Sequence, residues 1–176
     1  MTTTQLTRTP AKAAWRLGKR SRKVTLLVHI VSAGAWIGID VVVAVLVGVG
    51  WFADSDSTRG AAYQALGLFV VWPMLTSAVV CLGSGVLLGL GSKYGLVRYW
   101  WVAVKLFLNL LLTTLVLVAL KPGMPEIAEY GRSVSAGDPS GLDVSDLFFP
   151  PIVSLTLLTF ATTLSIFKPW GRTRRR

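Results

Sequence analysis

Apolar residues fill four long stretches of this 176-residue chain, and polar residues gather between them. The stretches cover residues 24–52, 66–90, 99–120 and 147–167. Each can cross ~30 Å of hydrocarbon as a helix, which takes about 20 residues. They are continuous, without the alternation of a lipid-facing strand, so a membrane barrel is disfavoured. The pattern predicts an all-α integral membrane protein, a bundle of four transmembrane helices.

Three polar segments complete the predicted organisation. Residues 1–23 form a basic N-terminal segment, and residues 168–176 form a basic tail. Residues 121–146 form a loop rich in Pro, Gly, Ser and acids, in which "PEIAEY" could make one helical turn and the remainder is expected to be irregular. The N-terminal segment is too long and polar for a signal peptide, so we expect an uncleaved anchor.

Charge gives the predicted helices a direction. Both termini and the connection 91–98 are basic and carry no acid, whereas the connections 53–65 and 121–146 are acidic. The positive-inside rule therefore places both termini in the cytoplasm, which requires an even number of spans and agrees with four.

A net charge of +10 would suggest nucleic-acid binding in a soluble chain. Here the cations lie next to apolar stretches, and no groove-reading motif accompanies them, so we expect no nucleic-acid partner. The basic tails favour anionic lipid instead. Cys81 is the only cysteine, which excludes an internal disulfide and any CxxC motif.

The first apolar stretch carries the only histidine, within "LLVHIVSAGAWIGID". At ~100° per helical residue, His29, Trp36 and Asp40 lie within about 20° of one direction. A buried ionisable group costs about 2.5–3.5 kcal/mol on insertion scales, so this face is predicted to point into the bundle. Two interpretations of His29 remain open: an axial haem ligand, or a histidine hydrogen-bonded to a neighbouring helix.

The third stretch carries a second polar face, with Lys105, Asn109 and Thr113 at i, i+4 and i+8. Lys105 and His29 each lie roughly two turns of ~5.4 Å from the cytoplasmic boundary, so we expect them at similar depth. Lys105 could meet a propionate, an anionic substrate or Asp40, or it could snorkel to the surface. Asp40 is expected closer in depth to Thr113 than to Lys105, so it stays open whether Asp40 and Lys105 form a salt bridge.

The other two stretches suggest packing rather than chemistry. Gly85 and Gly89 form a small-xxx-small pair. Thr156, Thr159 and Thr163 form a stripe that we interpret as interhelical contacts in preference to a transport path. The chain offers no hydrolase triad, no paired-carboxylate site and no soft ligand set for copper. If the protein is an enzyme, the remaining expectation is a haem-linked membrane oxidoreductase.

Three segments, "HIVSAGAWIGID", "GSKYGLVRYWWVAVKLFLNLLLTTLVLVAL" and "LSIFKPWGRTRRR", resemble a bacterial family of uncharacterised predicted integral membrane proteins. They follow the family's order and cover about half the chain. Their His-then-Trp-Gly and Trp-then-Lys patterns are similar, more distantly, to copper-resistance protein D and the J-type protoporphyrinogen oxidase. In the oxidase, a first-span histidine and a third-span lysine are associated with haem binding and activity. The resemblance implies these roles for His29 and Lys105, and a multi-pass location in the bacterial inner membrane.

The sequence departs from this pattern near the outer end of the third stretch. Members of these families often carry a second histidine there, where this chain has Ala119, Leu120 and Lys121. A bis-histidine haem within one chain is therefore excluded. A haem would have a single axial ligand, a second axial ligand that is not histidine, or a second axial ligand from another copy of the protein. The oxidase's arginine-rich context in the first span is also missing, which counts against that reaction.

The preferred function is binding of haem b or a porphyrin-like ligand between the first and third stretches. His29 would bind the haem iron and Lys105 an anionic group, with Trp36 and Asn109 beside them. The first alternative is a non-enzymatic scaffold or accessory subunit, held together by the polar faces and assembled with a second copy or another membrane protein. The second alternative is a small oligomeric transporter with Asp40 on its path.

Overall fold

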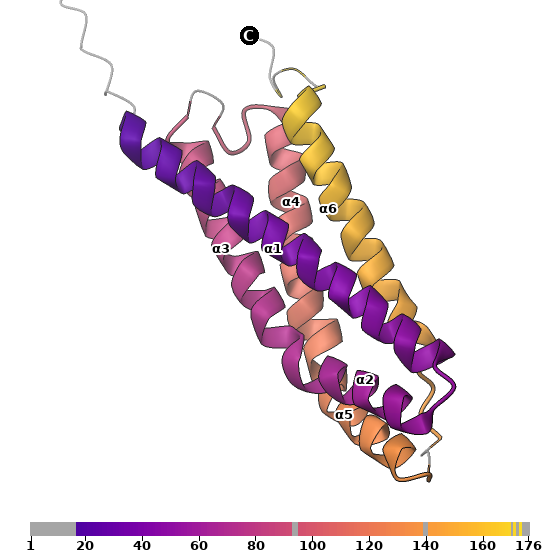
Figure 1. The fold of residues 1–176 in the computed structure, drawn as a ribbon. Coiled ribbons are helices and arrows are strands. Elements are labelled where there is room, and N and C mark those ends of the chain that lie inside the picture. The colour runs from indigo at the N-terminus through magenta and orange to yellow at the C-terminus, as the bar shows by residue number, and fades with distance from the viewer. Residues whose placement is uncertain (1–16, 93–94, 139–140, 170, 172, 174–176) are drawn as a thin grey trace, which may run out of the picture.

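The computed structural model describes residues 17–92, 95–138, 141–169, 171 and 173. This part of the chain is helical and contains no strand (Figure 1). The helices are α1 (Lys19–Phe52), α2 (Asp56–Phe69), α3 (Val71–Leu90), α4 (Trp100–Leu115), α5 (Lys121–Ser135) and α6 (Phe149–Phe167). A π-helical turn, η1 (Val116–Leu120), joins α4 to α5, and a 3-10 turn, η2 (Ser145–Phe148), precedes α6.

Four helical segments are long and apolar enough to cross a membrane: Lys19–Phe52, Val71–Leu90, Trp100–Ser135 and Ser145–Phe167. In the bundle, α1 packs on α3 and α6, and α4 packs on the same two helices from the opposite corner. The N-terminal end of α1 and the C-terminal end of α6 lie at the same end of the bundle (Figure 1). The predicted all-α class with four transmembrane helices is confirmed, and the protein is membrane-embedded.

The second span begins later than its apolar pattern predicts. The stretch 66–90 is interrupted at Val70, and the residues up to Phe69 belong to α2, which fills most of the expected connection. Ser55 accepts a hydrogen bond from the Thr58 N–H, and so caps α2. Pro73 lies in the first turn of α3, where its missing N–H breaks no helical hydrogen bond. Hydropathy alone does not resolve two consecutive helices that share an apolar junction.

The predicted irregular loop at 121–146 was wrong for its first half, which is the helix α5. The helix continues from α4 through η1, where the Lys121 N–H bonds the Val116 carbonyl five residues back. This wider turn lies just before Pro122 and Pro125, which lack N–H groups. Beyond it, α5 leaves the bundle and lies alongside α2 (Figure 1). Its buried residues follow a helical spacing: Met124, Ile127, Ala128, Tyr130, Gly131 and Val134.

Glycines bring α2 and α5 into backbone contact. A Cβ added at Gly60 would stand 2.4 Å from the Gly131 carbonyl, and one at Gly67 would stand 2.5 Å from the Met124 carbonyl. A Cβ at Gly131 would stand 2.7 Å from the Gln64 nitrogen. These pairings run in opposite directions along the two helices, so α2 and α5 are antiparallel. Only glycine allows so close an approach.

Side chains reinforce the α2–α5 pair. The rings of Tyr63 and Tyr130 meet edge to face with centroids 5.2 Å apart. Gln64 Nε2 donates to the Gly131 carbonyl at 3.3 Å and to Ser135 Oγ at 3.2 Å. The pair forms a folded cap over the end of the bundle where α1 ends and α6 begins.

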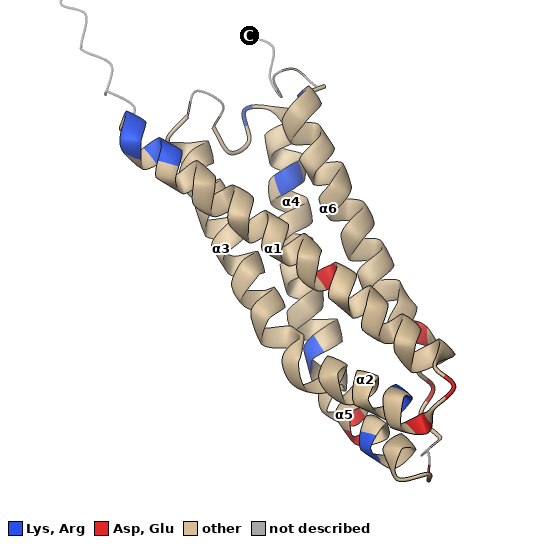
Figure 2. Cartoon of the chain, viewed as in Figure 1, with Lys and Arg blue, Asp and Glu red and all other residues tan. Residues whose placement is uncertain are grey.

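Charge is distributed unequally between the two ends of the bundle (Figure 2). Of the eight acids in the chain, seven lie in or next to α2, α5 and η2, and Asp40 lies within α1. The opposite end carries cations at the start of α1 and before α4, and no acid. The fold thus has one basic end and one acidic, capped end.

Candidate functional site

His29 is the first member of a polar cluster in the basic half of the bundle. Its Nδ1 lies 3.0 Å from the Cys81 carbonyl oxygen and 3.1 Å from Ser84 Oγ, both on α3. Since a carbonyl only accepts, Nδ1 carries the proton and donates to it. A Cβ at Gly85 would stand 3.1 Å from His29 Cε1, so glycine leaves room for the ring. Nε2 has no hydrogen-bond partner among the described residues.

Cys81 is the centre of this cluster. Its Sγ lies 3.7 Å from His29 Nδ1. The thiol is buried, with 4% of the residue exposed. The sulfur atom therefore lies beside the polar face of α1 that carries His29.

Lys105 lies on the opposite side of the cluster, and its Nζ donates a hydrogen bond to Ser165 Oγ of α6. The ammonium is also 5.9 Å from the centroid of the Trp101 ring. His29 and Lys105 thus belong to the same half of the interior, but each is hydrogen-bonded to a different helix.

Asp40 and Thr113 lie deeper in the bundle. Asp40 is 1% exposed, and Ser154 Oγ of α6 donates to its Oδ2 at 2.6 Å. Thr113 is buried, and its hydroxyl donates to the Asn109 carbonyl one turn back at 2.7 Å. Asp40 makes no ion pair with Lys105. The ion pairs within the described residues are Arg59–Asp56 and Arg132–Glu129, both in the cap.

Trp36 and Asn109 each present a buried polar atom without a partner. The Trp36 side chain is fully buried, and its Nε1 has no acceptor among the described residues. Asn109 Oδ1 is likewise buried without a described donor. Such atoms are rare in folded proteins because leaving them unpaired costs about 1–3 kcal/mol each.

The threonine stripe of α6 lies outside the cluster. Thr156 and Thr163 donate to the carbonyls of Ile152 and Thr159 in their own helix, and both are exposed on the outer surface. The interpretation of the stripe as interhelical contacts was wrong. The interior face of α6 carries Pro151, Ser154, Leu158 and Leu164 instead.

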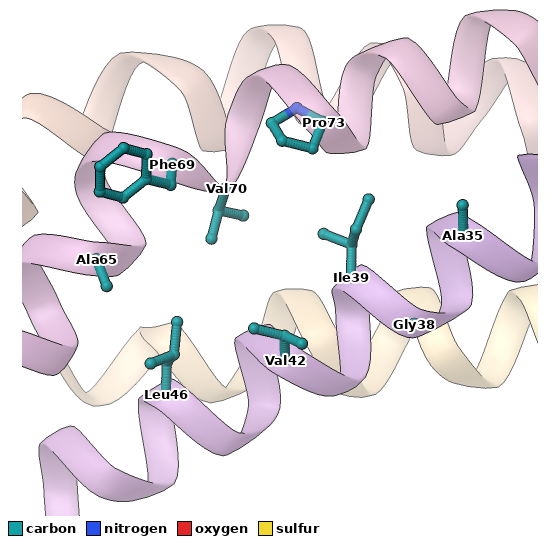
Figure 3. Close-up of a pocket in the computed structure, with 9 residues that line it drawn as sticks. All are labelled: Ala35, Gly38, Ile39, Val42, Leu46, Ala65, Phe69, Val70 and Pro73. Atoms are coloured by element: carbon teal, nitrogen blue, oxygen red, sulfur yellow. The ribbon is translucent and has the colours of Figure 1, made fainter.

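A separate groove runs between α1 and the α2–α3 junction (Figure 3). Its volume is about 460 Å³, and apolar residues line it throughout: Ala35, Gly38, Ile39, Val42, Leu46, Ala65, Phe69, Val70 and Pro73. Neither His29 nor Lys105 reaches it. A groove without a polar group can accept hydrocarbon but has nothing with which to orient a polar ligand.

The donor set does not suit a bare metal ion, and it includes groups that a porphyrin would use. The described residues contain no group of three or more His, Cys, Asp or Glu side chains that could hold an ion. A single-ligand haem needs one free imidazole nitrogen and groups for its carboxylates. His29 Nε2 meets the first requirement, and the Lys105 ammonium with the Ser165 hydroxyl meets the second.

Sequence reasoning missed the hydroxyl and thiol partners within the cluster. Ser84, Ser154 and Ser165 bond His29, Asp40 and Lys105 respectively. The Cys81–Ser84 spacing of three residues was an available sign of a polar face on α3. The chain matches no protein-family model, no curated protein and no solved structure.

Proposed function

We propose that the protein binds haem or a porphyrin-like ligand in the basic half of the bundle, with His29 as the axial ligand. The observation that carries the proposal is the hydrogen bonding of His29, whose Nδ1 is held by the Cys81 carbonyl and whose Nε2 is left without a described partner. Ligating histidines have this arrangement, because a bond to the other ring nitrogen fixes the tautomer and the ring orientation. The resemblance to porphyrin-related membrane families supports the same assignment.

The remaining cluster residues have distinct parts in this proposal. Lys105 and Ser165 would hold a propionate, because an ammonium and a hydroxyl both donate to carboxylates. Trp36 and Asn109 would border the ligand on the inner side. A bound haem would supply a one-electron redox centre. With His29 as the only histidine of the chain, the second axial position would be open, or filled by another residue type or a second copy.

Haem titration of the purified protein tests this proposal. We expect the wild type in detergent to develop a Soret band at one haem per chain, and His29→Gln to weaken haem binding by tenfold or more. The matched control is Thr76→Ala, whose hydroxyl only donates to the Trp72 carbonyl of its own helix. A wild type that gives no band, or a His29→Gln variant that titrates like the wild type, would refute the assignment.

A second candidate function, a scaffold or accessory subunit without a cofactor, is favoured by the interhelical hydrogen bonds. His29 joins α1 to α3, Lys105 joins α4 to α6, and Asp40 joins α1 to α6. Such bonds contribute about 0.6 kcal/mol on average within membranes. In this case His29→Ala lowers the melting temperature or the yield of an assembled complex, and no haem spectrum depends on it.

We also propose an orientation, in the inner membrane of a bacterium with both termini in the cytoplasm. The acid-free basic end supports it through the positive-inside rule. The basic tails would then bind anionic lipid of the inner leaflet, and a second copy or another membrane protein would cover part of the bundle.

Cysteine labelling tests the orientation, because Cys81 is the only native cysteine and can be replaced by serine. In that background, Ser57→Cys at the start of α2 should react with an impermeant maleimide added to spheroplasts. Ser21→Cys at the start of α1 should react only after permeabilisation. The reverse result would overturn the orientation.

A further inference from the structure

The chain after α6 folds back onto the start of α4. The Trp100 N–H donates to the Gly171 carbonyl at 3.5 Å, and the Thr173 N–H donates to a carbonyl of the same connection, that of Arg98, at 3.0 Å. The Thr173 hydroxyl donates to the Val97 carbonyl at 2.9 Å and also lies 3.2 Å from the Arg98 carbonyl. Four contacts therefore join the tail to residues 97–100 at the basic end.

The sequence at the end of α6 explains this return. The helix ends at Phe167, and Lys168 adopts the left-handed backbone conformation, with φ 46°. Its N–H bonds the Leu164 carbonyl at 3.1 Å and so closes the last helical turn. Pro169 follows, and it has no N–H with which to extend the helix. The chain therefore leaves the axis of α6 and turns back towards α4.

The start of α4 lacks a side-chain cap, and the tail supplies part of what is missing. The first N–H groups of a helix have no acceptor within the helix, and a short polar side chain usually provides one. The N-cap residue of α4 is Tyr99, and no side chain caps this helix. The Gly171 carbonyl accepts from the Trp100 N–H in its place.

The same two helices are joined a second time, deeper in the bundle, by the bond from Lys105 to Ser165. Lys105 follows Trp100 by five residues, so the two connections are about 7 Å apart along α4. A single connection leaves two helices free to slide or rotate about it. Connections at two levels fix the register of α4 against α6.

We propose that Lys168, Pro169, Gly171 and Thr173 form a tail strap that holds Lys105 beside Ser165 as one anion-binding pair. Thr173 is the anchor of the strap and a positioning residue, because it contributes both an N–H and a hydroxyl. When the strap is released, the long side chain of Lys105 can leave Ser165 and snorkel to the basic end. The anion-binding role of the pair rests on the proposed function, whereas the strap itself does not.

Hydrogen exchange of the haem-free protein in detergent tests the strap. In the wild type, the Thr173 amide should exchange at least roughly tenfold more slowly than an unstructured amide. Thr173→Val keeps the shape and the N–H but removes the hydroxyl, and most of this protection should be lost. The matched control is Thr163→Val, whose hydroxyl donates to the Thr159 carbonyl within α6. An unprotected amide in the wild type, or unchanged protection in Thr173→Val, would overturn the strap.

The reactivity of Lys105 tests its positioning in the same haem-free protein. Acetylation of its amine, followed by peptide mass spectrometry, should become several-fold faster in Thr173→Val and in Ser165→Ala, and should stay unchanged in Thr163→Val. Cys81 is the internal reference, because its buried thiol would react with maleimide only if the bundle loosened generally. An unchanged Lys105 rate in Thr173→Val, or a faster rate accompanied by Cys81 labelling, would overturn the positioning role.

A porphyrin with blocked carboxylates connects the strap to the proposed function. Thr173→Val should weaken the binding of haem several-fold and leave the binding of haem dimethyl ester unchanged. Equal weakening of both would contradict the positioning of an anion-binding pair. A wild type that binds neither porphyrin would refute the proposed function alone, because hydrogen exchange and acetylation are measured without a ligand.

Discussion

Ser154 Oγ donates a hydrogen bond of 2.6 Å to Asp40 Oδ2, joining α6 to α1 across 114 positions of the chain. Both residues are buried among apolar side chains, Asp40 with 1% of its surface exposed. A buried carboxyl group is destabilising unless a donor compensates for the water that it has lost. The bond therefore fixes the register between the first and the last helix.

Removal of this donor should destabilise the bundle. We expect Ser154→Ala to reduce the free energy of unfolding by about 1–3 kcal/mol, because Asp40 stays buried without the hydroxyl. The measurement is thermal unfolding in detergent. Thr156→Ala is the control, since that hydroxyl bonds its own helix on the exposed face, and its effect should stay within ~0.5 kcal/mol. Equal effects of the two substitutions would show that the bond is unimportant.

Substitution by alanine should have different effects on stability at two glycines of α5. A Cβ at Gly131 would stand 2.7 Å from backbone atoms of both Gly60 and Gln64, so α2 and α5 would have to separate. We expect Gly131→Ala to lose about 1–3 kcal/mol of stability. Gly123 has no neighbour within 4 Å of an added Cβ, so Gly123→Ala should be neutral or stabilising. Changes in melting temperature of the same sign and size for the two variants would contradict the close packing of α2 and α5.

Tyr63 gives the cap a pH dependence. Burial raises the pKa of its phenol, the neighbouring Tyr130 adds to the rise, and Arg59 opposes it. A raised native pKa means that the contribution to stability is complete below the unfolded value of about 10 and is lost as pH rises through the native value. We therefore expect alkaline destabilisation of the α2–α5 pair.

The alkaline effect is measured by melting curves between about pH 8 and pH 11, which bracket the unfolded tyrosine pKa. Tyr63→Phe should reduce the loss of stability across this range, and Tyr99→Phe, at the opposite end of the bundle, should not. An identical alkaline loss in wild type and Tyr63→Phe would assign the effect to another group.

The inward direction of the polar faces could be predicted from the sequence because lipid penalises an ionisable group strongly. Asp40 is buried, and the half-buried His29 and Lys105 each hydrogen-bond a neighbouring helix, as this cost requires. Their partners could not be predicted, because Ser154 and Ser165 belong to a helix whose register against α1 and α4 is set only by packing. One sequence does not specify the alignment of helices that are distant in the chain.

The cap shows a second limit of sequence reasoning. Pro122, Gly123 and Pro125 suggested a loop, but proline is tolerated where a π-helical turn absorbs the missing donors. The buried spacing from Met124 to Val134 was the opposing signal, and it prevailed because α2 offers a glycine-lined surface for that face. Tertiary packing outweighed local propensity in this segment.

The most direct test of the account is 15N NMR of the imidazole, because His29 is the only histidine and needs no further assignment. In the ligand-free protein we expect the proton on Nδ1, with a hydrogen bond to the Cys81 carbonyl. Addition of zinc protoporphyrin, which is diamagnetic and takes one axial ligand, should shift the Nε2 resonance and leave Nδ1 protonated. A proton on Nε2 in the free protein, or an Nε2 resonance that does not respond to the porphyrin, would contradict a ligand role for His29.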